Sequence, residues 1–470
     1  MKVLLVSPEV FPFKKTGGLA DVAGTLPLAL KKEGVDARIV MPGHKGISAP
    51  MKYVTDFAVD MNMYMETAVL KEGRSGDVPV YFICNHRYFD RDVLYGYADD
   101  AERYTFFSNA VVRMVEEGVF VPDVIHCNDW QSALIPALLK LGPKPKVDTD
   151  SPATVFTIHN LAYQGNFPPG ALLHTKLPGS LYNMDGLEFY GQMSFLKAGI
   201  LFADKISTVS PTYAQEMQDP QYGERMDGVL LKRAQDIYGI LNGIDTEVWD
   251  PYSDKSIPHN FDIRNFKGKE ADKKDLQHES GLPETKDPLI GMVTRLTDQK
   301  GLTIFMPVVE DLLKMGVQIV ILGAGDDHYQ NALRALSVAH PGLKVFLKYD
   351  EGMAHRIYAG SDFFLMPSKY EPCGLSQMIC FRYGTIPIVR QTGGLADSVK
   401  DLGKDPQKGS GFVFQSYDPA ELKACVGRAM EFYNDKKALE EVRRRCMGLD
   451  FSWAASAKKY ILLYEKALKG

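Results

Sequence analysis

Two cations lie five positions apart in the second half of the chain, Arg295 and Lys300 in the segment RLTDQKG. Arg295 follows a short apolar run and Lys300 precedes a helical pattern, so both belong to a strand-to-helix turn. Such a pair suits a diphosphate, because Arg binds phosphate oxygens through two parallel hydrogen bonds while Lys acts as a point charge. The alternative explanation is a pair of solvated loop cations.

A glycine-rich turn near the start is a second candidate for anion binding, formed by Lys15, Thr16, Gly17, Gly18, Leu19, Ala20 and Asp21. The two glycines let the backbone approach a ligand, the helix start favours an anion, and Lys15 adds a mobile charge. The segment matches neither the Walker pattern nor the dinucleotide pattern G-x-G-x-x-G. Its hexapeptide TGGLAD recurs after another strand, as Thr392, Gly393, Gly394, Leu395, Ala396 and Asp397. The alternative role of both copies is a tight turn.

Polar residues follow three further apolar runs, at the strand ends where doubly wound folds bind their ligands. Glu371 in PSKYEPCGL precedes a helix start, so its carboxylate can bind sugar hydroxyls or simply cap the helix. His159 and Asn160 close one strand, and Asp129 and Trp130 follow another. Trp and Asp are typical of sugar sites, where one stacks on rings and the other binds hydroxyls. A histidine at a strand end can also be a satisfied core residue.

The acidic and sulfur-containing residues suggest no metal and no glycosidase pair. No two carboxylates stand out as the acid and nucleophile of a glycosidase. Asp148 and Asp150 spell the D-x-D pattern of metal–diphosphate sites, but they follow a Lys/Pro-rich stretch without an apolar strand, which predicts a surface loop. The six cysteines include no C-x-x-C pair and no zinc spacing. We therefore predict that Arg295, Lys300 and helix dipoles carry the phosphate charge without a divalent ion.

The elements that must position these residues alternate between strand and helix. The continuous, β-branched-rich runs read as strands covered on both faces, and the longer periodic segments between them read as helices. The predicted strands are 3–6, 37–41, 78–83, 124–127, 154–158, 206–209, 289–293, 317–322, 344–347, 363–366 and 386–389. The pattern predicts an α/β fold with two doubly wound Rossmann-like domains, 1–243 and 288–452. The Pro- and Lys/Asp-rich stretch 244–287 reads as a linker, and 453–470 as an amphipathic helix.

Composition sets outer limits on the function. The 470 residues are 45% hydrophobic and 24% charged, so the chain can bury a large core, which excludes disorder and disulfide-stapled miniproteins. A net charge of −5 argues against a nucleic-acid partner. The apolar run VLLV is too short for a signal peptide, and no stretch approaches the length of a membrane span. Sparse cysteines suit a reducing compartment, so we predict a cytoplasmic protein without membrane partners.

The motifs together resemble the bacterial glycogen synthase and plant starch synthase family. The resemblance runs nearly end to end, through SPEVFPFKKTGGLADV, PDVIHCNDWQSALIP, TIHNLAYQG, ISTVSPTYAQEM, GILNGIDTEVWDP, VTRLTDQKG, PSKYEPCGLSQM and RQTGGLADSV. One departure is Asn128, where some members have His before the Asp-Trp pair; we expect little consequence, because Asp129 and Trp130 are intact.

The resemblance implies a GT-B architecture, in which the two domains face each other across a deep cleft and the C-terminal helix returns to the first domain. It implies transfer of glucose from ADP-glucose to the non-reducing 4-hydroxyl of an α-1,4-glucan such as glycogen, with retention at the anomeric carbon. Retention without an obvious nucleophile favours attack on the face from which ADP departs, and a double displacement is the alternative. The resemblance implies no cofactor and no metal.

Roles for individual residues also follow from the resemblance. It implies that the diphosphate and glucose hydroxyls are held by the catalytic set Lys15, His159, Arg295, Lys300 and Glu371. Further donor contacts are implied for Gly17, Gly18, Asp21, Asn160, Asn242, Tyr349, Cys373, Gly374, Leu375, Thr392, Gly393 and Gly394. Among these, Tyr349 is implied to pack on the adenine. Asp129 and Trp130 are implied to face the acceptor glucan.

Three alternative functions remain open at this point. A transferase of the same architecture could use UDP- or GDP-sugars, and a donor comparison separates this case. A glucan phosphorylase would need a buried pyridoxal-phosphate lysine and usually a much longer chain. A glucan-binding protein without catalysis has no need of the cations Lys15, Arg295 and Lys300. The sequence gives no oligomeric state.

Overall fold

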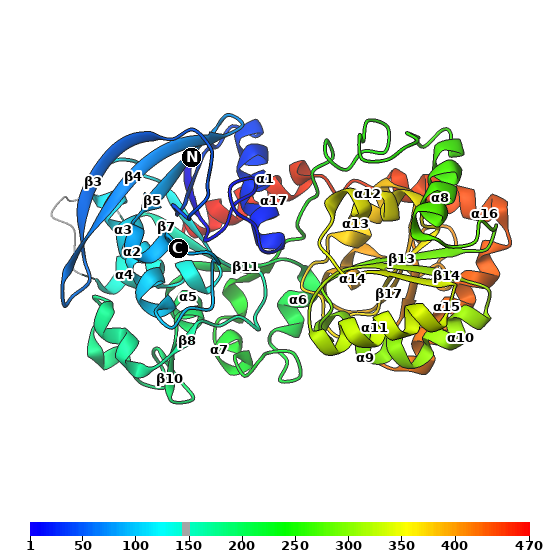
Figure 1. Ribbon diagram of the computed structural model, residues 1–470. Coiled ribbons are helices and arrows are strands. Elements are labelled where there is room, and N and C mark those ends of the chain that lie inside the picture. Colours follow the sequence, from blue (N-terminus) through cyan, green and yellow to red (C-terminus); the bar gives the residue numbers. More distant parts are fainter. Residues whose placement is uncertain (143–150) are drawn as a thin grey trace. The chain divides into compact units, whose positions relative to one another are not determined.

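The computed structural model describes residues 1–142 and 151–470, so the predicted surface loop with Asp148 and Asp150 lies outside the described residues. The chain folds into two units (Figure 1). Unit 1 comprises residues 1–243 and 453–470, and unit 2 comprises residues 244–452. Within the described part of the chain, no helix is long and apolar enough to cross a membrane.

Unit 1 is built on a sheet whose central strands are parallel. From one edge to the other its strands are β12 (Ile237–Gly239), β11 (Lys205–Thr208), β7 (Ala153–Ile158), β6 (Val124–Asn128), β1 (Lys2–Val6), β2 (Asp36–Pro42), β5 (Val78–Cys84), β4 (Met65–Ser75) and β3 (Lys52–Asp60). In the central strands, residues on both faces are buried, because helices cover both sides of a parallel sheet. Their continuous apolar runs are the direct consequence.

The helices of unit 1 include one from the far end of the chain. The principal helices are α1 (Gly18–Lys32), α3 (Asp100–Glu116), α4 (Leu134–Leu141), α5 (Phe195–Phe202) and α17 (Trp453–Ala467). Helices α1 and α17 lie side by side on the sheet (Figure 1). Tyr460 and Tyr464 of α17 are buried in the same core as Val3 and Leu5 of β1. The Tyr464 hydroxyl lies 2.8 Å from Nδ1 of His126, which fixes α17 to unit 1.

Smaller elements complete unit 1. A three-stranded sheet is formed by β8 (Asn166–Phe167), β10 (Gln192–Ser194) and β9 (Glu188–Phe189). The short helices are α2 (His86–Phe89), α6 (Pro211–Glu216) and α7 (Asp227–Leu231). Strands β3 and β4 were not predicted. They form an antiparallel extension of the main sheet, and their sequences KYVTDFAVD and METAVLKEGRS mix exposed polar residues with buried ones, which hides the strand pattern.

Unit 2 has a sheet of parallel strands only. Their order is β15 (Leu343–Phe346), β14 (Gln318–Leu322), β13 (Leu289–Val293), β16 (Phe363–Met366), β17 (Ile386–Arg390) and β18 (Phe412–Phe414). Its helices are α8 (Lys267–Ser280), α9 (Leu302–Phe305), α10 (Val309–Lys314), α11 (Asp327–Ala339), α12 (Glu351–Gly360), α13 (Ser376–Arg382), α14 (Gly393–Ser398), α15 (Pro419–Tyr433) and α16 (Lys436–Met447). Figure 1 shows α12 and α13 on one side of this sheet and α9 and α11 on the other.

The segment 244–287, predicted as a linker, lies within unit 2. Its helix α8 packs against α12. The composition was misleading because α8 buries a charged residue: the Lys269 ammonium donates to the Ala359 carbonyl at 2.8 Å and to the Thr385 hydroxyl at 2.6 Å. A helix that satisfies a buried lysine in this way shows little apolar periodicity. The predicted α/β class with two Rossmann-like parallel-sheet units is confirmed.

Candidate active site

In unit 2, the structure brings the candidate residues to one edge of the sheet. Strands β13, β16 and β17 are neighbours and run parallel, so their carboxyl ends lie together. Arg295 follows β13, Glu371 follows β16 and Thr392 follows β17. This edge is where ligands bind in open α/β sheets.

The Lys300 ammonium and the Glu371 carboxylate form an ion pair at this edge. Nζ of Lys300 lies 2.9 Å from Oε1 and 2.7 Å from Oε2 of Glu371. The Ser368 hydroxyl donates to the same Oε2 at 2.9 Å. Glu371 is buried, so the pair holds the lysine head in one place rather than leaving it to the solvent.

Arg295 lies on an exposed loop that is fixed to the Glu371 loop. Its guanidinium lies 3.3 Å from the Gln299 side-chain oxygen. The Gln299 carbonyl in turn accepts from the Lys369 amide at 2.9 Å. Because these contacts join the two loops, Arg295, Lys300 and Glu371 belong to one connected structure at this edge of the sheet.

The second copy of the glycine hexapeptide packs against the Glu371 loop. The Gly394 amide donates to the Glu371 carbonyl at 3.1 Å. A Cβ on Gly393 would lie 2.0 Å from the Glu371 carbonyl oxygen, and one on Gly394 would lie 2.0 Å from that of Cys373. Thr392, just before them, is buried. These glycines therefore allow backbone to lie directly on backbone, and their structural role is to shape the loop.

Further predicted donor residues surround this loop. Cys373 is buried, and Gly374 has a φ of +71°, a conformation that favours glycine. Leu375 is half-buried directly before α13. Tyr349 lies in the turn between β15 and α12 with its side chain 78% exposed. A ring this exposed has a free face on which a flat base can stack.

In unit 1, the candidates also gather at one sheet edge. Strands β1, β6 and β7 are adjacent and parallel. The Lys15 loop follows β1, Asp129 follows β6 and His159 follows β7. The two units thus present their predicted site residues in the same way, each at the carboxyl ends of its central strands.

The Lys15 loop is anchored by a buried carboxylate. Glu9 accepts hydrogen bonds from the Thr16 amide and from the Thr16 hydroxyl. Lys15 is exposed, with Nζ 2.7 Å from Asp21 in the first turn of α1. A Cβ on Gly17 would meet nothing within 4 Å, so this glycine borders open space, unlike Gly393. Gly18 is exposed at the start of α1, as an anion-binding helix start requires.

Asn128 determines which nitrogen of His159 carries the proton. The Asn128 amide group donates to the Val6 carbonyl at 3.0 Å, which turns its oxygen toward His159. Nε2 of His159 lies 2.8 Å from that oxygen and therefore carries the hydrogen. Burial lowers the pKa of His159 to about 3, so the imidazole is neutral and Nδ1 is its acceptor. Sequence reasoning noted Asn128 only as a family departure.

Asp129 supports the turn that carries His159 and Asn160. Its carboxylate accepts the His159 amide at 2.8 Å. Burial raises the pKa of Asp129 to about 7, although these amide hydrogen bonds oppose the rise. Asn160 itself accepts the Ala162 amide through its side chain at 3.1 Å. Asp129 thus acts on the site through the backbone that it holds.

The predicted stacking role of Trp130 is not supported, because its ring lies in the core of unit 1. Only 8% of Trp130 is exposed. Its ring centroid lies 5.0 Å from that of Tyr104 and 5.4 Å from that of Phe167. A Cβ on Gly165 would lie 2.6 Å from the Trp130 ring, so backbone covers another part of it. No free face remains for a sugar.

A hollow of about 400 Å³ lies beside the His159–Asn160 turn. It is lined by Ala162, Gln164, Asn166, Phe189, Tyr190, Gln192, Glu224 and Arg225. The Tyr190 ring is 69% exposed, and the Arg225 guanidinium lies 5.2 Å from its centroid. Amide side chains and an exposed ring are the groups that bind sugars. Sequence reasoning missed this hollow, since FYGQMS carries no recognisable pattern.

Two further polar residues, Asn242 and Arg390, are buried. Asn242 is buried near the end of the first segment of unit 1, and its side-chain oxygen has no hydrogen-bond partner among the described residues. Arg390, which sequence reasoning also missed, is buried and donates to the Ser368 carbonyl at 2.8 Å. This hydrogen bond holds the loop that carries Glu371. Arg390 directly precedes the second glycine hexapeptide, and this position was the one sign of its role in the sequence.

Comparison with known proteins places both units in one family. A family model described as "Starch synthase catalytic domain" matches residues 2–232, and one described as "Glycosyl transferases group 1" matches residues 273–445. The glycogen synthase of Moorella thermoacetica is 46% identical over 474 residues, covering 100% of this chain and 97% of that protein. The glycogen synthase of Thermotoga maritima is 46% identical over 484 residues, covering 100% and 99%.

Solved structures agree with these relatives. The catalytic domain of starch synthase IV from Arabidopsis thaliana, bound to ADP and acarbose, matches with a TM-score of 0.93 at 34% identity, covering 100% of this chain and 99% of that chain. Sucrose-phosphate synthase from Thermosynechococcus elongatus shares the fold, with a TM-score of 0.61 at 16% identity over 100% and 99% of the two chains. The family indicated by the motifs is thereby confirmed, and the chain belongs to the glycogen synthase and starch synthase family.

Proposed function

We propose that this member of the family transfers glucose from ADP-glucose to the 4-hydroxyl at the non-reducing end of an α-1,4-glucan, with retention. The observation that carries the proposal is the Lys300–Glu371 pair, with Lys300 bound at 2.9 and 2.7 Å on the same sheet edge as Arg295. A cation pair beside a buried carboxylate suits a ligand that combines a diphosphate with a sugar.

The reaction breaks the bond between the anomeric carbon and the ADP oxygen, and forms a bond from that carbon to the acceptor oxygen. Negative charge develops on the diphosphate as it leaves. Arg295 and Lys300 are positioned to stabilise that charge, and fixed donors of this kind contribute about 3–4 kcal/mol each. The acceptor proton goes to the departing phosphate oxygen. Because Arg295 and Lys300 stabilise the negative charge of the leaving diphosphate, the proposal requires no metal.

Unit 1 supplies the groups for the sugar. The neutral His159 imidazole offers Nδ1 as an acceptor for a glucose hydroxyl, because Nε2 is occupied by Asn128. Asn160 and the Lys15 loop lie at the same edge of the unit 1 sheet. On the nucleotide side, the exposed Tyr349 ring is suited to stack on adenine. ADP is the nucleotide bound by the Arabidopsis starch synthase IV relative.

The acceptor glucan is assigned to the hollow beside His159–Asn160 rather than to Trp130. Its exposed Tyr190 ring can stack on a glucose ring, and Gln164 and Gln192 can bind hydroxyls. Asp129 serves this side indirectly through the His159 amide. Tyr190→Ala is expected to raise the KM for short maltooligosaccharides without changing that for ADP-glucose.

A donor comparison tests the proposal. The protein is incubated with glycogen and either ADP-glucose or UDP-glucose, and both nucleotide release and glucose incorporation are measured. We expect ADP release matched by incorporation and a clear preference for ADP-glucose. Preference for UDP-glucose would make the protein a different nucleotide-sugar transferase, and glucose 1-phosphate formation from glycogen and phosphate would make it a phosphorylase. Glycogen binding without ADP release would leave only a binding protein.

A cytoplasmic location is part of the same proposal. ADP-glucose and glycogen are intracellular compounds, and all six cysteines of the chain lie in the described residues as free thiols. Five of the six are buried, as expected for thiols that serve packing.

A further inference from the structure

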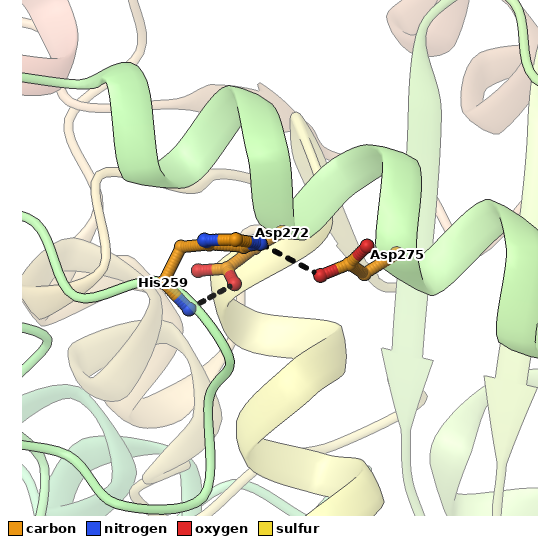
Figure 2. A group of neighbouring side chains, drawn as sticks. All are labelled: His259, Asp272 and Asp275. Carbon is orange, nitrogen blue, oxygen red and sulfur yellow. Dashed lines mark hydrogen bonds and ion pairs between the residues drawn. The ribbon is translucent and has the colours of Figure 1, made fainter.

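A cluster of three metal-ligand side chains lies in unit 2, apart from the residues assigned to the donor. His259 belongs to the loop before α8, and Asp272 and Asp275 lie three positions apart on α8 and therefore on one face of it. Figure 2 shows the three side chains turned toward one another. In the described part of the chain, this is the one group of three such residues whose ligand atoms all lie within 4.8 Å of each other.

The cluster already has part of the geometry of a coordination site. Nε2 of His259 lies 2.9 Å from Oδ2 of Asp275. In a tetrahedral zinc site, two ligand atoms at about 2.1 Å from the ion lie about 3.4 Å apart, so this pair has to open by about 0.5 Å to admit the ion. The His259 backbone amide donates to Oδ1 of Asp272 at 2.9 Å, which holds that carboxylate beneath the imidazole.

An independent observation points to a missing ligand at Asp272. This residue is only 2% exposed, and its Oδ2 has no hydrogen-bond partner. The nearby Lys269 cannot neutralise it by contact, because its ammonium donates to Ala359 and Thr385. A buried carboxylate oxygen without a hydrogen-bond partner destabilises the folded protein. A cation beside Oδ2 would remove this cost.

We propose that His259, Asp272 and Asp275 bind a divalent first-row transition metal ion of the zinc type. One imidazole with two carboxylates is a donor set that suits such ions, whereas magnesium and calcium prefer oxygen ligands alone. The two carboxylates balance the ion's charge. The side chains of His259 and Asp275 are 48% and 49% exposed, so they have room to close around the ion, and water can fill the remaining positions.

The bound ion would connect the loop before α8 to the helix. Its effect is on the folding of unit 2, because an ion that binds only the folded state stabilises it by mass action. The proposal is independent of the transfer reaction, so removing metal should not abolish activity at temperatures where the protein is folded.

Zinc titration of chelator-treated protein tests the site. We expect one zinc ion per chain by calorimetry, and an increase of several degrees in the melting temperature at saturating zinc. Asp272→Asn keeps the size of the side chain and removes its charge, and His259→Ala removes the nitrogen ligand. Each is expected to weaken zinc binding at least tenfold and to reduce the thermal shift at a fixed zinc concentration. Without metal, Asp272→Asn should melt no lower than the parent protein, since it removes a buried unpaired charge.

A matched control separates this site from surface histidines. Nε2 of His340 lies 3.4 Å from Glu310, a histidine–carboxylate pair that lacks the buried third oxygen. His340→Ala should therefore keep both the zinc affinity and the thermal shift. An unchanged zinc affinity in Asp272→Asn and His259→Ala, or a loss of zinc affinity in His340→Ala, would overturn the proposal. Should Asp272→Asn fail to fold, His259→Ala alone decides, because its side chain is half-exposed.

Discussion

Removing Lys300 should damage both the stability and the chemistry of the protein, and the two effects can be separated. Lys300 contacts both carboxylate oxygens of Glu371, and the two side chains are 17% and 7% exposed. Lys300→Ala leaves Glu371 with the Ser368 hydroxyl as its hydrogen-bond donor, at 2.9 Å. Breaking a buried ion pair on one side costs about 3–5 kcal/mol of unfolding free energy. Losing one fixed cation at the leaving group lowers kcat by roughly 10²- to 10³-fold.

The double variant Lys300→Ala/Glu371→Gln distinguishes the two effects. Neutralising Glu371 removes the uncompensated charge, so most of the lost stability should return, whereas kcat should stay low because the cation is still absent. Urea midpoints report stability, and ADP release with glycogen reports kcat. Lys423→Ala is the matched control: its Nζ lies 2.6 Å from Asp311 with both side chains exposed, so its loss should cost less than about 1 kcal/mol and leave kcat unchanged. Recovery of kcat in the double variant, or near-parental kcat in Lys300→Ala, would refute the reasoning.

Three further changes test other parts of the site. Tyr349→Ala should raise the KM for ADP-glucose roughly 5- to 100-fold, since base stacking is worth about 1–3 kcal/mol, with kcat little changed; an equal fall in kcat would contradict a binding role. Gly394→Ala places a Cβ 2.0 Å from the Cys373 carbonyl oxygen, so kcat should fall at least about tenfold while the circular dichroism spectrum stays native. Gly228→Ala is the control, because a Cβ there meets nothing within 4 Å, and it should leave kcat unchanged. The folded pKa of Asp129, about 7, lies above its ordinary 3.8, so stability is lost as pH rises between these values, by at most about 4 kcal/mol. Asp129→Asn should remove this loss between pH 4 and pH 7, and an unchanged pH dependence of the urea midpoint would count against it.

The central strands could be predicted because their sequence pattern has one cause. A strand covered on both faces must be apolar throughout, and 289–293 and 363–366 were predicted with the bounds that β13 and β16 have. The hairpin of β3 and β4 was missed because one of its faces meets water. Helix α8 was missed for a related reason. Lys269 has a charged side chain but is buried in the fold, where its ammonium donates hydrogen bonds to the Ala359 carbonyl and the Thr385 hydroxyl.

In the candidate site too, the positions of residues could be predicted from the sequence, but the surroundings of their side chains could not. Parallel strands end at one edge, so the residues that follow β13, β16 and β17 could be expected to meet from their order alone. What a side chain faces after the strand end is decided by packing. Trp130 has the residue type of a sugar platform, yet aromatic neighbours enclose it, while Tyr190 lies exposed in a segment that carries no motif. Gly17 and Gly393 belong to identical hexapeptides, and only their surroundings show that one borders open space and the other touches backbone.

The kinetics of Arg295→Ala test the central claim most directly. Arg295 is exposed, so its removal should leave the urea midpoint within about 0.5 kcal/mol of the parent protein. If its guanidinium stabilises the departing diphosphate, kcat with ADP-glucose and glycogen should fall roughly 10²- to 10³-fold. Arg334→Ala, an exposed arginine of the same unit, is the control and should keep the parental rate. A parental kcat in Arg295→Ala would contradict the account.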